Sequence, residues 1–413
     1  MNNDLEVIFL GGLFPKEKEM EILKNSIGNI QNAANNLQWA IVDGLDLNLH
    51  EPTTIINSMY IGSFPKRYKS LTIDTFKFSH TGSDSLKDIN VGFVNLTGIK
   101  HISRYLSLKP YLKKWAASPN GKKKVIIAYA MTSTFANLLK LVKKINTTVI
   151  TCMIVPDLPQ YMTLEKNNEF YNVMKKIEIK SIKNDMKYID GYVILTKHMR
   201  EALKIKVPTV VIEGISTSLF ENIDRLPIEK GIKSILYSGG LIEKYGVINL
   251  VRSFQKLSGD HYRLIICGAG NAESEIIQAS QIDKRIIFKG LLKREEVLQL
   301  QKSATILVNP RPNNEEYTKF SFPSKILEYM SSGTPVISYE LDGIPSEYYD
   351  YIYPVSKQED GLFITLKEVL SKPDDELAEK GLRAKEFVYS EKTSAKQAEK
   401  ILNLIRSIDR AKQ

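Results

Sequence analysis

The chain has 413 residues, with 43% hydrophobic and 25% charged residues and a formal net charge of +10, which predicts two or three domains of ordinary folded composition. It contains no run of 18 apolar residues and no signal-peptide pattern, so we expect neither a transmembrane helix nor secretion. Cys152 and Cys267 lie in apolar runs, and the five histidines have no metal-ligand spacing. We therefore expect buried thiols in a reducing cytoplasm, with no disulfide and no metal site.

The first half alternates predicted strands and helices. Residues 5–10 form the first expected strand, which runs into Gly11 and Gly12 and then into a helix over 16–35. A glycine pair at this place lets a ligand approach the backbone closely, although such pairs also form turns that bind nothing. Residues 50–90 are polar and irregular, and so long a loop is typical of a ligand or partner contact. Further strands are expected at 39–42, 91–96, 124–130, 147–155, 191–196 and 207–212, and helices at 132–146, 165–187 and 197–203.

Residues 98–124 combine many basic residues with three aromatic ones, a mixture typical of contact with an anionic membrane or polyanion. The charge distribution agrees, because residues 1–205 hold 28 Lys and Arg against 18 Asp and Glu, whereas residues 206–413 hold 29 of each. The alternative is a solvated helix whose aromatic side chains face the core. No nucleic-acid partner is expected, since zinc-finger, RNP-like and helix-turn-helix signatures are missing.

Asp157 lies in a short loop that follows the predicted strand 147–155. In open α/β sheets ligands bind at the carboxyl ends of the strands, so Asp157 is a candidate site residue. The alternative is a carboxylate that caps a turn or a helix.

A polar connector at 213–232 precedes a second series of α/β units. It begins with a strand and glycine turn at 235–241, and continues with strands at 262–267, 285–288 and 304–308 and helices ending at 257 or spanning 273–279, 293–303, 360–370, 375–388 and 394–408. This order predicts an α/β fold with two doubly wound parallel-sheet domains, 1–212 and 233–388, and ligands at the carboxyl ends of both sheets. We expect the last segment, 389–413, to return to the first domain.

The stretch 320–339 has an informative local pattern. Ser321 and Pro323 favour a helix start, Gly333 ends that helix, and a short buried strand follows. The positive end of such a helix and its backbone N–H groups suit a phosphate group. Glu328 could accept two hydrogen bonds from the diol of a ribose, and the alternative is an ordinary surface glutamate.

Five motifs of the second half occur in the order and spacing of a known family. They are Ser238-Gly-Gly-Leu, Glu243-Lys-Tyr-Gly, Gly268-Ala-Gly, Phe288-Lys-Gly and the run from Phe322 to Val336. Through them, residues 234–350 resemble the nucleotide-sugar-binding domain of family 4 glycosyltransferases of the GT-B fold. The first half resembles the acceptor domain of that family only in its strand–Gly-Gly opening and its α/β alternation.

The resemblance implies a GT-B fold, in which two Rossmann-like domains face each other across a cleft. It also implies a retaining transfer from a nucleotide sugar, UDP in the first place, with no metal or other cofactor. Glu328 matches the second Glu of the E-x7-E motif, which holds the ribose, and Lys244 matches the lysine that contacts the donor diphosphate. We expect Lys244 and Asp157 to be catalytic, Asp157 through a polar contact with the acceptor. The expected substrate-binding residues are Gly11, Gly12, Gly239, Gly240, Lys244, Gly268, Arg311, Phe320, Ser321, Phe322, Pro323, Ser324, Lys325 and Glu328.

Two positions depart from the family pattern. Phe320 stands where the first Glu of E-x7-E belongs, and Gly240 stands where many members have Arg. One carboxylate contact to the donor sugar and one phosphate cation are therefore missing. Arg311 or Lys325 could supply the cation.

The favoured function is a glycosyltransferase that extends a glycan or a lipid-linked glycan in polysaccharide or glycoconjugate assembly. Its expected location is the cytoplasm, with peripheral association at the inner face of the cell membrane through residues 98–124. Phe320 and Gly240 favour an alternative, a non-catalytic subunit that binds a nucleotide or a membrane. A nucleotide-sugar epimerase or hydrolase of the same architecture is the third reading, disfavoured by the shortage of histidines near the glycine turns.

Overall fold

The computed structural model describes residues 5–412 except 29, 83–85, 120, 160–168, 218 and 228, and the side chains of 169–172 are also outside the description. The chain divides into two compact units, which are described separately. Unit 1 comprises Met1–Ile215 and Ser394–Gln413, and unit 2 comprises Ser216–Thr393. The division falls within the connector 213–232. None of the helices in the described part of the chain is long and apolar enough to cross a membrane.

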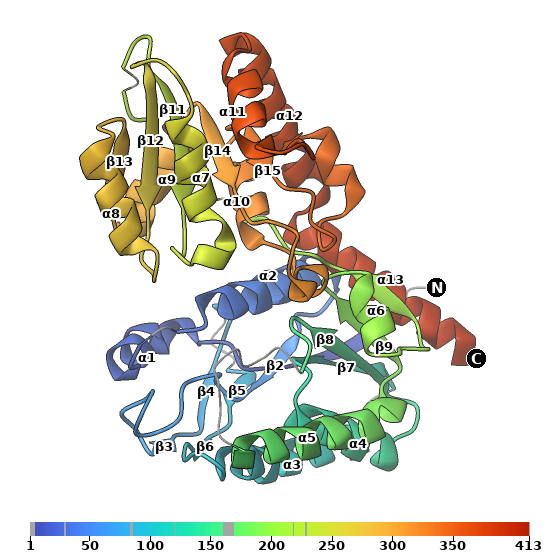
Figure 1. Cartoon of the computed structure of the whole chain (residues 1–413). Coiled ribbons are helices and arrows are strands. Elements are labelled where there is room, and N and C mark those ends of the chain that lie inside the picture. Colours follow the sequence, from blue (N-terminus) through green and yellow to red (C-terminus); the bar gives the residue numbers. More distant parts are fainter. Residues whose placement is uncertain are drawn as a thin grey trace. The chain divides into compact units, whose positions relative to one another are not determined.

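Unit 1 is built on an eight-stranded sheet with the strand order β10-β9-β8-β7-β1-β2-β5-β4 (Figure 1). Neighbouring strands pair in parallel except β4 and β5, which are antiparallel. Successive strands are added on one side of β1 and then, from β7, on the other, so the topology switches between β1 and β7. The strands are β1 (Leu5–Gly11), β2 (Thr54–Asn57), β4 (Phe76–Phe78), β5 (Asp88–Asn90), β7 (Lys123–Tyr129), β8 (Ile150–Val155), β9 (Gly191–Ile194) and β10 (Thr209–Val211). A separate pair joins β3 (Thr72–Ile73) to β6 (Phe93–Val94).

Helices cover both faces of this sheet (Figure 1). Helices α2 (Asn32–Asn48) and α13 (Ser394–Lys412) pack on one face, where Val7 and Phe9 of β1 join their core. Side chains alternate along a strand, so Ile8 and Leu10 point to the other face. The helices on that face are α3 (Lys100–Ala117), α4 (Ser133–Ile145) and α5 (Glu169–Asp185). Shorter helices are α1 (Glu19–Asn25) and α6 (His198–Ala202).

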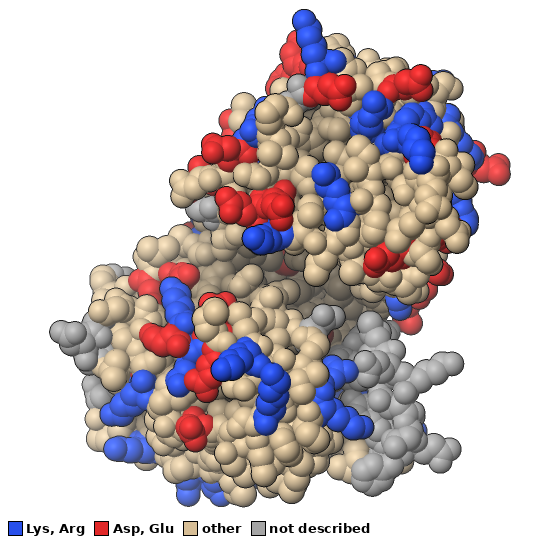
Figure 2. Space-filling model, turned by 90° about the vertical axis from the view of Figure 1, so that its left-hand side faces the viewer, with Lys and Arg blue, Asp and Glu red and all other residues tan. Residues whose placement is uncertain are grey.

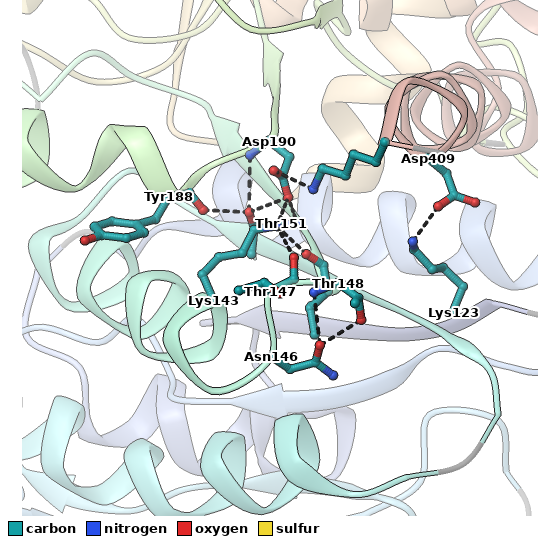
Figure 3. A network of polar contacts seen from close by, with 11 residues as sticks. Lys123, Lys143, Asn146, Thr147, Thr148, Thr151, Tyr188, Asp190 and Asp409 are labelled. Atoms are coloured by element: carbon teal, nitrogen blue, oxygen red, sulfur yellow. Dashed lines mark hydrogen bonds and ion pairs between the residues drawn. The ribbon is translucent and has the colours of Figure 1, made fainter.

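Ion pairs attach the C-terminal helix α13 to unit 1 (Figure 3). Asp190 accepts from the ammonium groups of Lys143 at 2.6 Å and Lys412 at 2.7 Å, while Lys123 pairs with Asp409 at 2.5 Å. Burial alone would raise the pKa of Asp190, but the hydrogen bonds from both lysines outweigh it and lower the pKa. These contacts, together with the apolar packing on α2, make α13 part of unit 1.

Unit 2 contains a six-stranded, all-parallel sheet with the order β13-β12-β11-β14-β15-β16. Numbered within the unit this is 3-2-1-4-5-6, the doubly wound order that binds nucleotides where the strand order reverses. That switch point lies between β11 and β14. The strands are β11 (Lys233–Ser238), β12 (Tyr262–Cys267), β13 (Ile286–Gly290), β14 (Ile306–Asn309), β15 (Val336–Ser338) and β16 (Tyr353–Pro354).

Two hydrophobic cores cover the two faces of the second sheet. Ile235 and Tyr237 of β11 belong to the core that contains α7 (Val247–Gln255), α8 (Glu273–Ile282) and α11 (Gly361–Leu370). Leu236, between them, belongs to the core with α10 (Ser324–Ser331) and α12 (Asp374–Glu391). This alternation explains why β11 is apolar at every position from 235 to 237. Helix α9 (Arg294–Ser303) precedes β14.

Some predicted elements of the first half are wrong. Residues 39–42, predicted as a strand, lie inside α2, where Ile41 and Val42 join Leu45 in the core that α2 shares with α13. The helix predicted at 16–35 is divided into the 3-10 turn Lys16–Lys18, α1 and the start of α2. Residues 50–90, predicted to be irregular, contain the strands β2, β3, β4 and β5. Residues 165–168 of the predicted helix 165–187 lie outside the described residues.

Candidate functional site

The glycine turns of unit 2 lie at the carboxyl ends of β11 and β12. Gly268 has φ +140°, and a Cβ atom on it would lie 1.8 Å from the carbonyl oxygen of Gly239. A Cβ on Gly239 would lie 2.2 Å from Cε of Lys325. The positive φ and the backbone contact require glycine at position 268, whereas a Cβ on Gly239 would only displace the end of the Lys325 side chain, which lies against the end of β11.

Gly240 differs from these two glycines. A Cβ atom there would have its nearest neighbours at 3.7 Å, on Tyr245, and 3.9 Å, on Ile242. Neither packing nor a positive φ requires glycine at this exposed position. The missing arginine of the family pattern thus has no steric explanation within unit 2.

Lys325 and Glu328 occupy consecutive turns of α10. Burial lowers the pKa of the Lys325 ammonium, whose nitrogen lies 5.9 Å from the centre of the Tyr329 ring. Burial alone would raise the pKa of Glu328, but the charges of Lys325 and Arg294 and a hydrogen bond from Gln301 outweigh it and lower the pKa. Glu328 is therefore an ionised carboxylate beside the Lys325 cation, which itself lies against the glycine turn after β11.

Two residues from α9 hold the Glu328 carboxylate. Arg294 Nη2 donates to Oε2 at 2.9 Å, and Gln301 Nε2 donates to Oε1 at 2.6 Å. Gln301 is fully buried and also donates to Oγ of Ser238 at the end of β11. The side chain of Arg294 is 56% exposed, so water can replace it as a donor to the carboxylate. The buried Gln301 therefore fixes the orientation of the carboxylate. Nothing in the sequence pattern singled out either residue.

A second group of cations lies at the loop after β14. The guanidinium carbon of Arg311 lies 4.6 Å from the centre of the Tyr317 ring and 5.6 Å from that of Tyr245. Arg311 Nη2 donates to Oγ of Ser321 at 3.2 Å. The ammonium of Lys244 lies 5.7 Å from the Tyr317 ring, so the same tyrosine lies within reach of both cations.

The described carboxylates form no ion pair with Lys244 or Arg311. The backbone brings the two together, because Gly246, with φ +80°, packs so closely on the loop that a Cβ would lie 2.0 Å from the carbonyl oxygen of Pro310. Tyr237 connects this group to the glycine turns, since its hydroxyl donates to the carbonyl of Gly240 at 2.8 Å. Two cations at the switch point that form no ion pair with the described carboxylates can bind an anion such as a diphosphate.

The residues that precede α10 have different positions. Pro323 is the N-cap of α10 and Ser324 its first residue. The Phe322 side chain is 7% exposed and packs on Tyr348 with ring centres 5.3 Å apart, so it belongs to the core and only its backbone can meet a ligand. Phe320 is half-buried at the end of the 3-10 turn Glu316–Phe320.

The predicted site residues of unit 1 lie at the ends of β1 and β8. Gly11 and Gly12 are buried, and a Cβ on Gly12 would lie 2.4 Å from the ring of Tyr60. Gly12 N donates to Oε1 of Gln38 at 2.8 Å. Asp157 is exposed at the end of β8, yet desolvation of its carboxyl group raises the pKa of that group.

The residues described by the structure contain no group of three or more His, Cys, Asp or Glu side chains placed to hold a metal ion. Cys152 and Cys267 are both buried free thiols, and burial raises the pKa of each. The structure thus gathers Gly239, Gly240, Lys244, Gly268, Arg311, Ser321, Lys325 and Glu328 at the switch point of unit 2, and it places Gly11, Gly12 and Asp157 in unit 1.

Comparisons with known proteins agree with this geometry. Residues 232–372 match the family described as glycosyl transferases group 1. Sucrose-phosphate synthase from Thermosynechococcus elongatus has a similar structure, with a TM-score of 0.61 at 15% identity over 98% of this chain and 100% of that one. No curated protein sequence matches the chain significantly.

Two further solved structures are similar over nearly their whole lengths. The lipopolysaccharide outer core galactosyltransferase WaaB has a TM-score of 0.61 at 16% identity, covering 97% of this chain and 99% of that one. The α,α-trehalose 6-phosphate synthase from Burkholderia multivorans has a TM-score of 0.63 at 10% identity, covering 98% and 97%. Together these structural likenesses confirm the predicted GT-B fold with two Rossmann-like domains. The family match, to glycosyl transferases group 1, lies within unit 2.

Proposed function

We propose that the chain is a glycosyltransferase that moves a sugar from a nucleoside-diphosphate sugar, UDP in the first place, to a glycan or lipid-linked glycan acceptor. One observation carries the proposal: Lys244 and Arg311, which form no ion pair with the described carboxylates, lie at the same switch point as the half-buried carboxylate of Glu328. A diphosphate fits the two cations, and a ribose diol fits the carboxylate.

In the proposed reaction the acceptor hydroxyl attacks the anomeric carbon on the face from which the diphosphate departs. The bond between that carbon and the phosphate oxygen breaks, and the acceptor proton passes to the departing diphosphate. Lys244 and Arg311 stabilise the negative charge that develops on the leaving group. Configuration is retained, no enzymic nucleophile is needed, and Asp157 contacts the acceptor hydroxyls. No metal is required in this scheme.

The proposal is tested with a panel of UDP-, GDP- and dTDP-sugars. A ligand that binds the folded state raises the midpoint of thermal unfolding, and turnover releases the nucleoside diphosphate. We expect stabilisation by one base and release of that nucleotide when a glycan or lipid-linked acceptor is added. Unchanged midpoints with the whole panel would refute the proposal.

A second function, a non-catalytic nucleotide-binding subunit, is favoured by Phe320 and Gly240. These residues remove a carboxylate and a cation that the family pattern supplies, while Lys244 and Glu328 are retained. The same panel separates the two functions. Stabilisation by a nucleotide without sugar transfer to any acceptor favours the subunit.

We also propose a location in the cytoplasm, with peripheral association at an anionic membrane through residues 98–124. Ile102 and Leu106 of α3 are 62% and 58% exposed, and Lys113 and Lys114 are exposed on the same helix, which supports this proposal. On the face drawn in Figure 2, however, Lys and Arg side chains are scattered among Asp and Glu. Flotation with vesicles that contain anionic phospholipid tests the association. A Lys113→Glu/Lys114→Glu variant is expected to lose flotation, because two cations near the membrane surface are reversed.

A further inference from the structure

Two cations of α3 turn inward instead of toward solvent. Lys100 and Arg104, one helical turn apart, are 8% and 5% exposed. Lys100 Nζ donates to the carbonyl of Ile61, and Arg104 Nη2 donates to the carbonyl of Met59. The guanidinium carbon of Arg104 also lies 4.3 Å from the centre of the Phe93 ring.

No carboxylate among the described residues forms an ion pair with either cation. Glu178 of α5 interacts with His101 and accepts from Oγ of Ser133 at 3.1 Å. Arg104 Nε is buried and has no hydrogen-bond acceptor. Burial and the charge of Arg104 lower the pKa of Lys100 to about 7, and burial lowers the pKa of Arg104 to about 10.

Such a pair is costly if it serves the fold alone. A buried cation needs an opposite charge to offset its lost hydration, and apolar side chains of similar size would stabilise the same helix face better. Leu108 and Leu112, which continue the four-residue spacing of Lys100 and Arg104 on α3, show that this face accepts apolar residues. The two cations therefore indicate a function beyond packing.

The pair lies at the topological switch of the sheet of unit 1, where ligands of doubly wound folds bind. Tyr60 lies at this switch point. Its ring covers Gly12, at the end of β1, and its hydroxyl donates at 2.7 Å to the carbonyl of Tyr129, at the end of β7. The Arg104 guanidinium carbon lies 5.2 Å from the centre of the Tyr60 ring. Tyr60 and Thr132 are half-buried and His101 is exposed, so solvent reaches the rim of the cluster.

We propose that Arg104 and Lys100 form a subsite in unit 1 for a phosphate group carried by the acceptor. The proposal rests on the proposed transferase function only in calling that ligand the acceptor. A planar guanidinium with an unused N–H recognises phosphate oxygens directionally, and the ammonium adds a point charge. A group that enters so buried a cluster is a small anion, not a membrane surface. A sugar phosphate and a lipid-linked diphosphate share this chemistry.

The test uses the full chain with UDP at saturation, so that the cations of unit 2 are occupied. Thermal stabilisation is measured with inorganic phosphate, with a hexose phosphate, and with farnesyl diphosphate in detergent micelles. The variants are Arg104→Met and Lys100→Met, and the control is Lys144→Met, which removes an exposed lysine of α4 that lies outside residues 98–124. Lys100→Gln, which keeps a donor for the carbonyl of Ile61, serves as a milder variant if the others unfold.

We expect the apparent affinity for at least one probe to fall tenfold or more in the Arg104 and Lys100 variants, and to stay unchanged in Lys144→Met. Stabilisation by UDP should be unchanged in all folded variants. Binding of farnesyl diphosphate alone identifies a lipid-linked acceptor, and binding of the hexose phosphate a soluble one. Equal binding by the folded Arg104 and Lys100 variants and the wild-type chain, or no binding of any probe to the wild type, would overturn the subsite.

Failure of the proposed transferase function can be distinguished experimentally from failure of the proposed phosphate subsite. If UDP does not bind, the phosphate titration is repeated in a Lys244→Ala/Arg311→Ala variant, in which the cations of unit 2 cannot contribute. Binding that persists there and disappears with Arg104→Met supports the subsite independently of any transfer reaction. Binding that is already lost in the double variant would overturn it.

Discussion

The guanidinium of Arg311 stacks on the ring of Tyr317, with 4.6 Å between the guanidinium carbon and the ring centre. Stacking fixes the plane of the guanidinium and leaves N–H groups along its edge free to donate. The loop after β14 can thus present a planar cation at the switch point of unit 2. This supports the proposal that Arg311 supplies the phosphate contact that Gly240 cannot make.

Replacement of Arg311 by alanine should weaken UDP binding at least tenfold, or about 1.4 kcal/mol, because a charge-assisted contact to phosphate is lost. Titration calorimetry measures the change. The matched control is Arg252→Ala, which removes a 71% exposed arginine from α7 of the same unit. Unchanged affinity in Arg311→Ala would exclude Arg311 from the donor site.

An arginine introduced at Gly240 should restore the lost affinity in the Arg311→Ala background. Its Cβ would meet no atom closer than 3.7 Å, so the substitution fits without strain. Gly239→Ala provides the contrast, because its Cβ would lie 2.2 Å from Cε of Lys325 and should displace that side chain. Binding of UDP by the Gly240→Arg/Arg311→Ala double variant, compared with the single variants, checks both expectations.

Glu328→Gln should separate recognition of the nucleoside from recognition of the diphosphate. The amide cannot pair with Arg294 or offset the charge of Lys325, and it is a poorer acceptor for ribose hydroxyls. We expect UDP affinity to fall about tenfold while inorganic pyrophosphate binds as well as before or better. A parallel loss of both ligands would indicate a general disruption of α10 rather than a ribose contact.

A buried histidine predicts how the stability of unit 1 depends on pH. His80 lies between Asp88, 2.6 Å from Nδ1, and Asp46, 2.7 Å from Nε2, with Asp43 close to both His80 and Asp46. Burial alone would lower the pKa of His80, but the hydrogen bonds to the two carboxylates outweigh it and raise the pKa to about 9.

The raised pKa means that the folded state holds the proton more tightly than the unfolded state, whose histidine titrates near 6.5. This contribution to stability is fully present below about pH 6.5 and is lost as the pH rises through about 9. Urea denaturation of the wild-type chain should therefore show a loss of about 3 kcal/mol between pH 6 and pH 10 relative to His80→Asn. Parallel profiles of the two proteins would contradict the ion-pair account.

The donor half of the fold follows from local sequence signals. Each strand of unit 2 ends in a glycine turn or a loop whose composition is distinctive, so β11, β12 and α10 could be placed within a few residues. The α2 helix could not. The apolar run at 39–42 looks like a strand until α13, more than 350 residues away in sequence, provides the surface on which it packs.

The inward orientation of Lys100 and Arg104 could have been predicted from their spacing along α3, although not from the composition of the stretch. Both residues share a four-residue spacing with Leu108 and Leu112, which places them on the apolar face of α3. Counting the bases of residues 98–124 gives a positive stretch, whereas their periodicity assigns two of them to the interior. Contacts between distant helices, such as Arg294 of α9 with Glu328 of α10, leave no pattern in the sequence.

Calorimetric titration of UDP, GDP and dTDP into the full chain shows whether unit 2 binds a nucleoside diphosphate through Lys244 and Glu328. We predict that one of the three binds with one site per chain. Its affinity should fall at least tenfold in Lys244→Ala, in line with loss of a charged phosphate contact. Absence of binding by all three nucleotides, or equal affinity in the wild-type and Lys244→Ala proteins, would contradict this mode of binding.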